Sequence, residues 1–314
     1  MRIAVTGASG FVGGAVCRAA RAERWRVHAF GRRPAVEPGH VGGAPYRAWD
    51  LLGPAPAALG EVDAVVHCAG GVTDWGPAAE IWAANVTGTR NAARAFPSAA
   101  FVHVSTASVY DPFRPTVRAR EDEAPVARYV NAYGASKAAA ERVAAEAAPG
   151  RTVVLRPHAV YGPGDTTLLP RVLGAVRGGR LVAVGDGRQL VSLTSVDNLA
   201  RACLLAAEAA ARRGVHGTFN VTDAEPVVLD DALRAVLRER GVAAEPYYLP
   251  LRLAEPVAAV AETAARLLGR RRPPRLTRYA AGHLAVERTL DITAARERLG
   301  YRPAPTSFAG AADW

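Results

Sequence analysis

The chain has 314 residues, 50% of them hydrophobic, and carries a formal net charge of +10. This length predicts two domains or one large one, and no apolar run reaches the roughly 18 residues of a transmembrane helix. Met1 and Arg2 lead directly into a strand and a glycine-rich turn, so no signal peptide is indicated. The cysteines Cys17, Cys68 and Cys203 are far apart, which favours buried thiols in a reducing compartment over disulfides or metal ligands. We therefore expect a cytoplasmic protein without a metal site.

The positive charge requires nucleic-acid binding to be considered. The arginines are scattered, however, and the densest run is Arg270-Arg271-Arg272. No helix-turn-helix or zinc motif accompanies this run. We expect a solvated, arginine-rich surface and no nucleic-acid partner, with attraction of an anionic cofactor as a secondary effect.

The first predicted elements are a buried strand over residues 3–6, a glycine-rich turn and an Ala-rich helix over residues 14–22. This order is typical of a dinucleotide-binding site. The first glycine permits a tight turn, the second lets backbone approach the pyrophosphate, and the third lets the helix pack close to the strand. The helix N-terminus offers unpaired N–H groups to the phosphates. The expected dinucleotide-binding residues of this turn are Gly7, Ser9, Gly10, Phe11, Val12 and Gly13.

The second predicted strand covers residues 26–30 and ends where NAD(H) and NADP(H) sites differ. An NAD site usually carries an acidic residue here, which binds the ribose 2′-hydroxyl. This chain has Gly31, Arg32 and Arg33 instead. No carboxylate would repel a 2′-phosphate, and two guanidinium groups can pair with it. The residues favour NADP(H) over NAD(H), with two solvated loop arginines as the alternative interpretation.

Further short strands are predicted: one ends at residues 48–51, and three others cover residues 64–70, 101–105 and 152–155. Helices are predicted between them, over residues 77–96 and up to about residue 148. This alternation predicts an α/β fold with a doubly wound parallel Rossmann sheet. Ligands of such sheets bind at the carboxyl ends of the strands. Asp50, Ala69, Ser105, Thr106 and Pro157 all follow predicted strands, so we expect them to face one crevice.

After residue 165 the pattern loosens. Helices are predicted over residues 168–176, 229–240 and 255–268, whereas a helix over 196–211 and a strand over 218–221 return to the sheet. We therefore expect an NADP-binding Rossmann domain of residues 1–165 plus about 190–222. A smaller, interleaved substrate-binding lid would comprise about residues 166–189 and 223–314.

Lys137 is the only lysine among 39 lysine and arginine residues, and Tyr133 lies four residues before it. On a helix this spacing places both side chains on one face. An ammonium group beside a phenol stabilises the phenolate and lowers the pKa of the tyrosine. The pair is a candidate general acid/base, although the Y-x-x-x-K pattern also occurs by chance.

Together these motifs resemble the extended short-chain dehydrogenase/reductases, which include sugar-nucleotide epimerases, 3β-hydroxysteroid dehydrogenases and dihydroflavonol reductases. The resemblance covers nearly the whole chain. Its segments are 6–13, 50–51, 67–70, 85–89, 105–110, 133–137, 156–164, 196–197 and 299–303. The motifs are highly specific for the fold and the cofactor, and much less so for the substrate.

The resemblance implies roles for individual residues. Tyr133 would be the catalytic acid/base, and Lys137 would lower its pKa and hydrogen-bond the nicotinamide ribose. Thr106 would orient the substrate oxygen, with Ser105 as a second candidate. The expected cofactor contacts beyond the glycine-rich turn are Arg32, Arg33, Asp50, Leu51, Ala69, Lys137, Pro157 and Val160. The chain departs from the family pattern at Asp111, where glycine commonly follows the Val-Tyr pair.

Three segments indicate the branch of the family to which the chain is most similar. Sugar-nucleotide enzymes usually carry an arginine for the substrate diphosphate where this chain has Val191, and such a contact is worth about 1.5–3 kcal/mol. His67 to Gly76 and the tail from Arg275 to Tyr279 look like the hydroxysteroid-dehydrogenase branch. The apolar helix from Pro250 to Leu268 would either line a pocket for a hydrophobic carbonyl compound or form ordinary core.

We therefore expect an NADP(H)-dependent oxidoreductase that interconverts a carbonyl and a secondary alcohol on a largely apolar small molecule. A sugar-nucleotide epimerase or dehydratase is the enzymatic alternative. A non-catalytic NADP(H)-binding sensor is the alternative of another class, and it would need the glycine-rich turn but not Tyr133 or Lys137. A homodimer is compatible with this interpretation.

Overall fold

The computed structural model describes residues 1–270, 272–274 and 276–314. Arg271 and Arg275, which belong to the arginine run and to the C-terminal segment noted above, lie outside these ranges. Within them, a seven-stranded parallel sheet has the order β13-β7-β5-β4-β1-β2-β3. The strands are β1 (Arg2–Thr6), β2 (Arg26–Gly31), β3 (Tyr46–Ala48), β4 (Ala64–His67), β5 (Ala100–Val104), β7 (Thr152–Pro157) and β13 (Gly217–Val221). The order reverses at β1, so the predicted doubly wound Rossmann sheet is confirmed.

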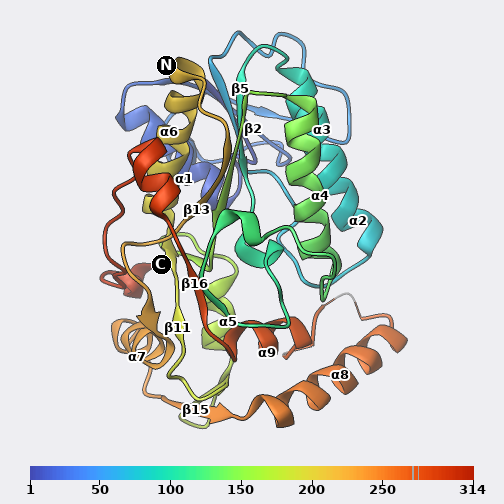
Figure 1. Cartoon of the computed structure of the whole chain (residues 1–314), viewed down its shortest axis with the longest axis vertical. Coiled ribbons are helices and arrows are strands. Elements are labelled where there is room, and N and C mark those ends of the chain that lie inside the picture. Colours follow the sequence, from blue (N-terminus) through green and yellow to red (C-terminus); the bar gives the residue numbers. More distant parts are fainter. Residues whose placement is uncertain (271, 275) are drawn as a thin grey trace.

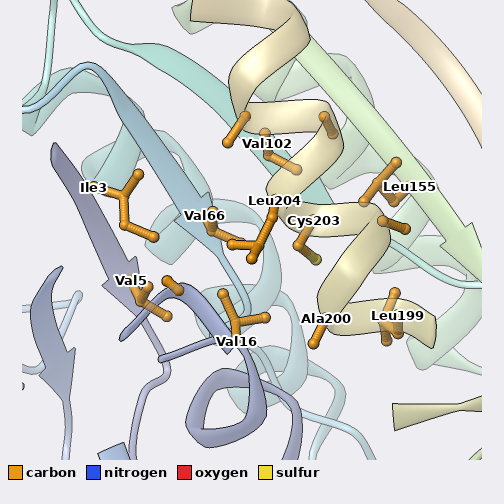
Figure 2. Close-up of a cluster of buried hydrophobic side chains, with 14 of the residues drawn as sticks. Ile3, Val5, Val16, Val66, Val102, Leu155, Leu199, Ala200, Cys203 and Leu204 are labelled. Carbon is orange, nitrogen blue, oxygen red and sulfur yellow. The ribbon is translucent and has the colours of Figure 1, made fainter. Parts of the chain in front are cut away.

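Helices cover both faces of this sheet (Figure 1). On one face lie α1 (Phe11–Ala22) and α6 (Val196–Arg213), which pack on each other. On the other lie α2 (Ala78–Trp82), α3 (Gly88–Ala95) and α4 (Ala132–Ala147). The core between α6 and the sheet is built from small and branched side chains, among them Val66, Val102, Leu199, Ala200 and Cys203 (Figure 2). Alanines on α6 let the helix approach the strands closely.

The helix predicted over residues 77–96 is interrupted. A π-helical turn, η2 (Ala83–Thr87), separates α2 from α3. Buried Asn85 in this turn accepts a hydrogen bond from the Gly71 N–H (2.7 Å) and donates one to the Ser136 hydroxyl (2.9 Å). The wider turn thus lets Asn85 link the segment after β4 to α4, which gives this family motif a structural role.

Smaller sheets, built mostly from the C-terminal half and joined by β6 from the N-terminal half, lie beside the carboxyl ends of the large one. Their strands are β6 (Thr116–Ala119), β8 (Val160–Tyr161), β9 (Val176–Arg177), β10 (Arg180–Val184), β11 (Leu190–Val191), β12 (Thr194–Ser195), β14 (Val227–Val228), β15 (Glu245–Leu249) and β16 (Arg288–Leu290). The helices are α5 (Leu168–Gly174), α7 (Leu229–Glu239), α8 (Leu251–Leu267) and α9 (Arg278–Leu284). Short turns are η1 (Pro38–Val41), η3 (Ala107–Val109), η4 (Glu121–Glu123), η5 (Ala295–Leu299) and η6 (Ala311–Asp313). The predicted domain limits stay a prediction.

Helix α8 begins four residues before its predicted start and contains Pro256. A proline inside a helix removes one backbone hydrogen bond. The helix continues because Ala254, Ala258, Glu262 and Ala265, spaced by three or four residues, are all buried on one side. In the described parts of the chain, no helix has the length and apolar character needed to cross a membrane.

Candidate active site

A cavity of about 1120 Å³ lies at the carboxyl ends of the central strands. It receives residues that follow β1, β2, β4, β5 and β7, as expected for this topology. All residues predicted for the site line it. They are Gly7, Ser9, Gly10, Phe11, Val12, Gly13, Arg32, Arg33, Asp50, Leu51, Ala69, Thr106, Tyr133, Lys137, Pro157 and Val160. Tertiary folding thus brings together segments spread over more than 150 residues, while their individual roles stay predictions.

The glycine-rich turn has the shape that a dinucleotide pyrophosphate requires. Gly7 has φ +73°, and a Cβ there would lie 2.6 Å from the Ala69 amide nitrogen. A Cβ on Gly13 would overlap the Gly7 carbonyl, so α1 packs close to the turn. Gly10 is the N-cap of α1 and supplies no side-chain hydrogen bond to the first turn. The first turn of α1 therefore lines the cavity without a side-chain cap on its N–H groups, which fits a bound phosphate.

Side-chain atoms of Ser9 and Tyr46 crowd the position of Gly31 at the end of β2. A Cβ on Gly31 would lie 2.6 Å from Ser9 Oγ and 2.8 Å from the Tyr46 hydroxyl. The Tyr46 hydroxyl is held in place, because it donates a hydrogen bond to the Arg33 carbonyl (2.7 Å). Arg32 and Arg33 are exposed and line the cavity. Tyr46 was not anticipated, because only the folded sheet brings β3 beside the end of β2.

The first turn of α4 packs directly on the segment after β5. Asn131 caps the helix by accepting a hydrogen bond from the Gly134 N–H (3.0 Å). A Cβ on Gly134 would lie 2.8 Å from the Ser108 carbonyl oxygen. This close approach brings Tyr133 near Thr106, whose hydroxyl group acts to lower the pKa of the Tyr133 phenol. Both side chains line the cavity, and their joint role stays a prediction.

The electrostatics of the pair differ from the expectation. Loss of hydration raises the pKa of Tyr133 above its ordinary value, nearby Tyr279 adds to this, and the Thr106 hydroxyl opposes it. Burial lowers the pKa of Lys137 to about 8, against the opposing effect of Glu141. Lys137 Nζ donates to the Val104 carbonyl (2.7 Å). The charge of Lys137 does not contribute to the pKa shift of Tyr133. The phenol is therefore protonated at neutral pH, and the lowering of its pKa by Lys137 is not found here.

Two further hydroxyl groups extend the pair. Thr106 Oγ1 donates to Ser108 Oγ (3.1 Å), which shares a hydrogen bond with the Tyr279 hydroxyl (2.6 Å). All these residues line the cavity. Tyr279 lies in α9, 171 positions after Ser108. In the sequence, Tyr279 was noted only as part of the segment 275–279, which resembles the hydroxysteroid-dehydrogenase branch.

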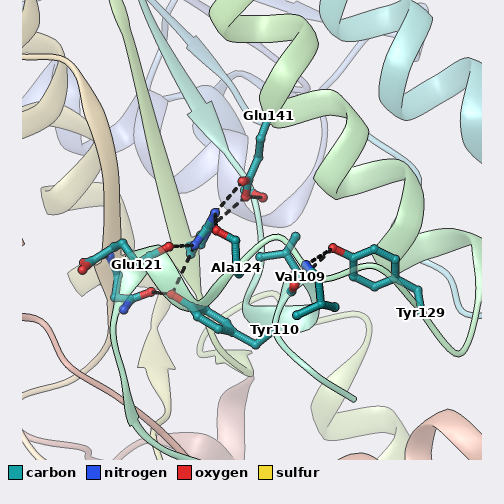
Figure 3. A network of polar contacts seen from close by, with 10 residues as sticks. Val109, Tyr110, Glu121, Ala124, Tyr129 and Glu141 are labelled. Atoms are coloured by element: carbon teal, nitrogen blue, oxygen red, sulfur yellow. Dashed lines mark hydrogen bonds and ion pairs between the residues drawn. The ribbon is translucent and has the colours of Figure 1, made fainter. Parts of the chain in front are cut away.

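A buried ion pair fixes α4 relative to β7 (Figure 3). Arg156 donates from Nη2 (2.8 Å) and Nε (3.0 Å) to the Glu141 carboxylate. Its Nη1 donates to the Glu121 carbonyl (2.8 Å) and to the Tyr110 hydroxyl (3.3 Å). The Ser105 hydroxyl donates to Glu141 (2.5 Å). Because Ser105 serves this network, Thr106 is the better placed of the two candidates for contact with a substrate oxygen.

Another part of the cavity is apolar and comes from the C-terminal half. Its lining includes Leu168, Leu169, Val172, Leu181, Leu233 and Phe308. Asp74, whose side chain is 1% exposed, also lines the cavity. Its carboxylate accepts a hydrogen bond from the Thr277 hydroxyl (2.8 Å) and pairs with Arg171 (2.5 Å). The apolar helix over residues 250–268 was expected either to line a pocket or to form core. In the structure only one side of this helix is buried. α8 contributes no residue to the lining, which comes instead from the following Pro273 and Pro274.

Asp111, where the chain departs from the family pattern, lies outside the cavity. The Asp111 carboxylate accepts a hydrogen bond from the Phe113 N–H (2.8 Å), which explains it as a turn residue outside the cavity. Among the residues described, no three His, Cys, Asp or Glu side chains are grouped so that they could hold a metal ion.

Comparisons with known proteins agree with this geometry. Residues 3–222 match the NAD dependent epimerase/dehydratase family. A 2-alkyl-3-oxoalkanoate reductase of Stenotrophomonas maltophilia is 35% identical over 314 residues, covering 96% of this chain and 95% of that protein. A 4-hydroxy-2-methyl-3-oxo-4-farnesyl-3,4-dihydroquinoline-1-oxide ketoreductase of Stigmatella aurantiaca is 37% identical over 246 residues, covering 76% of this chain and 72% of that protein.

A solved structure shows the same architecture over almost the whole length. MoeE5 in complex with UDP-glucuronic acid and NAD superposes with a TM-score of 0.72 at 25% identity, covering 98% of this chain and 95% of that one. Fold, glycine-rich turn and sequence similarity thus lead to one conclusion: the chain belongs to the NAD-dependent epimerase/dehydratase family of extended short-chain dehydrogenase/reductases.

Proposed function

We propose that this protein is an NADP(H)-dependent oxidoreductase that interconverts a ketone and a secondary alcohol on a largely apolar small molecule. One observation carries the proposal. A single cavity holds the glycine-rich turn, the side chains of Thr106 and Tyr133, and an apolar lining from α5, α7 and β10. Ketone reduction needs these three parts: a dinucleotide site, a proton donor and a place for the carbon skeleton.

The chain's own residues supply the proton and the orientation. A bound reduced nicotinamide nucleotide supplies the hydride that reaches the carbonyl carbon. Thr106 and Tyr133 hydrogen-bond the carbonyl oxygen, and the Tyr133 phenol donates its proton as the alcohol forms. The raised pKa of Tyr133 keeps this proton in place at neutral pH. Lys137, with a pKa of about 8, is charged at pH 7, and we propose that it hydrogen-bonds the nicotinamide ribose.

The preference for NADP(H) rests on the end of β2. In NAD sites a carboxylate binds the 2′-hydroxyl, but Ser9 and Tyr46 occupy the space into which a side chain on Gly31 would project. Arg32 and Arg33 stand beside it, exposed and facing the cavity. Two guanidinium groups without a neighbouring acid suit a 2′-phosphate. MoeE5 was solved with NAD, so the preference needs a direct measurement.

The relatives' names suggest which carbonyl compounds to test first. One relative reduces 2-alkyl-3-oxoalkanoates, and another is a ketoreductase for a farnesylated quinoline. Both names describe a ketone beside an alkyl or isoprenoid chain, which matches the apolar lining of this cavity. We therefore propose ketones with alkyl substituents, including 3-oxo acids, as substrates.

The sugar-nucleotide alternative has weaker support. It requires a guanidinium for the diphosphate, and the position where the family usually carries it is Val191, which is buried and lines the cavity. Arg171 also lines the cavity, but it is paired with Asp74. Micromolar binding of a UDP- or TDP-sugar, measured by calorimetry, would favour this alternative.

The replacement Tyr133→Phe tests the proposal. It keeps the ring and removes the proton donor, so we expect turnover of a responsive ketone to fall by at least about 100-fold. NADPH oxidation is followed by absorbance, and NADPH binding is measured separately and should change little. The matched control is Tyr247→Phe, since Tyr247 is exposed and outside the cavity. Unchanged turnover in Tyr133→Phe would refute the mechanism, and NADPH binding without turnover of any ketone by the unaltered protein would favour the sensor.

A further inference from the structure

Helix α8 presents an apolar stripe to solvent. Leu253, Val257, Val260, Leu267 and Leu268 are 57%, 62%, 70%, 83% and 69% exposed. The first four recur at helical spacing, so they lie along one side of the helix. Large exposed apolar patches on otherwise polar surfaces mark sites of contact with other molecules.

The stripe is separate from the side of α8 that packs on the protein. The buried residues Ala254, Ala258, Glu262 and Ala265 occupy the opposite side. In Figure 1 α8 runs along the lower edge of the molecule, and in that view no element of the described residues lies below it. The core therefore does not explain these five side chains.

Positive charge accompanies the end of the stripe. Arg266, Arg270 and Arg272 are exposed there. The acidic residues of the helix are already paired: Glu262 with Arg266 (3.3 Å) and Glu255 with Arg278 (3.7 Å). Within the described residues no acidic side chain pairs with Arg270 or Arg272. This end of α8 thus carries an excess of positive charge beside an apolar surface.

The same end of α8 borders the cavity. Arg266 stacks over Trp75 at 5.2 Å, and Trp75 Nε1 donates to the Arg270 carbonyl (3.0 Å). Val72, which is 63% exposed, and exposed Pro273 both line the cavity. The cavity therefore reaches the surface next to the arginine-rich end of the apolar stripe.

We propose that the outer side of α8 lies on an anionic lipid surface, with its Leu and Val side chains among the acyl chains and its terminal arginines at the headgroups. Helices that lie in the membrane interface combine an apolar side with Arg or Lys at its border. A second copy of this chain fits less well, because the stripe offers no unpaired carboxylate to the arginines of the other copy. Anionic headgroups supply that complement. The arrangement also turns the cavity opening toward the membrane, from which an apolar compound can enter.

Sedimentation with vesicles tests this proposal. The full chain is mixed with vesicles of phosphatidylcholine, alone or with an equimolar amount of phosphatidylglycerol, and the bound fraction is measured. We expect binding to the mixed vesicles that weakens as salt is added. Val260→Glu removes an apolar contact and adds a repelled charge, so its partition coefficient should fall about tenfold or more. Val117→Glu is the matched control, because Val117 is 64% exposed on β6.

Arg270→Gln combined with Arg272→Gln separates the charge from the apolar contact, and it should weaken binding to the mixed vesicles only. Failure of the unaltered protein to bind mixed vesicles would overturn the proposal. Equal losses in Val260→Glu and Val117→Glu would overturn it too. So would a lipid-free dimer that Val260→Glu converts to monomers, since α8 would then pair with a second copy. NADPH oxidation with a water-soluble ketone should be the same in Val260→Glu, so the result is independent of the proposed reaction.

Discussion

The residues that we propose to hold the cofactor and those that we propose to move the proton owe their properties to different causes. Gly7, Gly13 and Gly31 matter because backbone or side-chain atoms occupy the space that a Cβ would need. Tyr133 and Lys137 matter because loss of hydration shifts their pKa values in opposite directions, upward for the phenol and downward for the ammonium. Both groups therefore lie closer to their neutral forms than they would in water.

Changing Arg32 and Arg33 together to Ala tests the cofactor preference. The guanidinium groups would pair with a 2′-phosphate, and charge-assisted pairs are worth about 1.5–3 kcal/mol each. We expect the Kd for NADPH to rise at least about tenfold while the Kd for NADH changes little, as measured by fluorescence titration. Arg94→Ala on α3 is a control, because Arg94 is exposed outside the cavity. Equal weakening of both nucleotides would contradict the preference.

At the scale of single elements, the position of α4 decides whether the site exists. Asn131 and Gly134 seat its first turn on the segment after β5, and Glu141, two turns further along, is tied to Arg156 at the end of β7. The same carboxylate accepts a hydrogen bond from Ser105 at the end of β5. The Glu141 carboxylate thus connects α4, the helix that carries Tyr133, with β5 and β7.

Replacing Glu141 with Gln should destabilise the protein strongly. The Arg156 guanidinium is 2% exposed, and without the carboxylate it would be a buried charge with only neutral partners. Breaking a buried pair on one side costs about 3–5 kcal/mol, so we expect the free energy of unfolding in urea to fall by about that amount. Glu208→Gln removes the partner of Arg212 in an exposed pair and should cost less than about 1 kcal/mol. A similar small loss in both variants would show that the buried pair is not needed.

For the whole molecule, the buried histidines make stability depend on pH. His67 lies between the Thr6 and Thr89 hydroxyls (2.7 and 2.9 Å), and its ring stacks on His103. Burial lowers the pKa of His67 to about 3 and that of His158 to about 4. Burial also holds the pKa of His103 well below its ordinary value. The folded protein therefore keeps these rings neutral.

The sign of the pH effect follows from these directions. Below pH 6.5 the unfolded chain protonates its histidines, whereas the folded chain does not until about pH 4 or 3. Stability should therefore be complete above pH 6.5 and fall as the pH decreases, by about 2 kcal/mol per buried histidine at pH 5. Urea unfolding at pH 7 and pH 5 measures this loss. His158→Gln should show a smaller loss than the unaltered protein, while exposed His216→Gln should show the same loss; an identical loss in all three would contradict the assignment.

The sequence by itself determined the elements and the motifs, because these depend on residues close together in the chain. Hydrophobic runs and the glycine spacing predicted the parallel sheet, the dinucleotide turn and the helix with Tyr133 and Lys137, and the structure contains all of them. It also predicted which segments share one cavity, because parallel strands place their carboxyl ends together.

Only the tertiary structure decided the properties that depend on distant neighbours and on burial. It interrupted a predicted helix with the π turn at Asn85, placed Tyr46 beside Gly31, and joined Tyr279 to Ser108. It also reversed the expected pKa shift of Tyr133, because loss of hydration, to which Tyr279 adds, outweighs the opposing effect of the Thr106 hydroxyl. The exposed apolar side of α8 was also decided by tertiary packing. Apolar residues that recur every three or four positions predict an apolar side of a helix, but only packing shows which side the protein leaves uncovered.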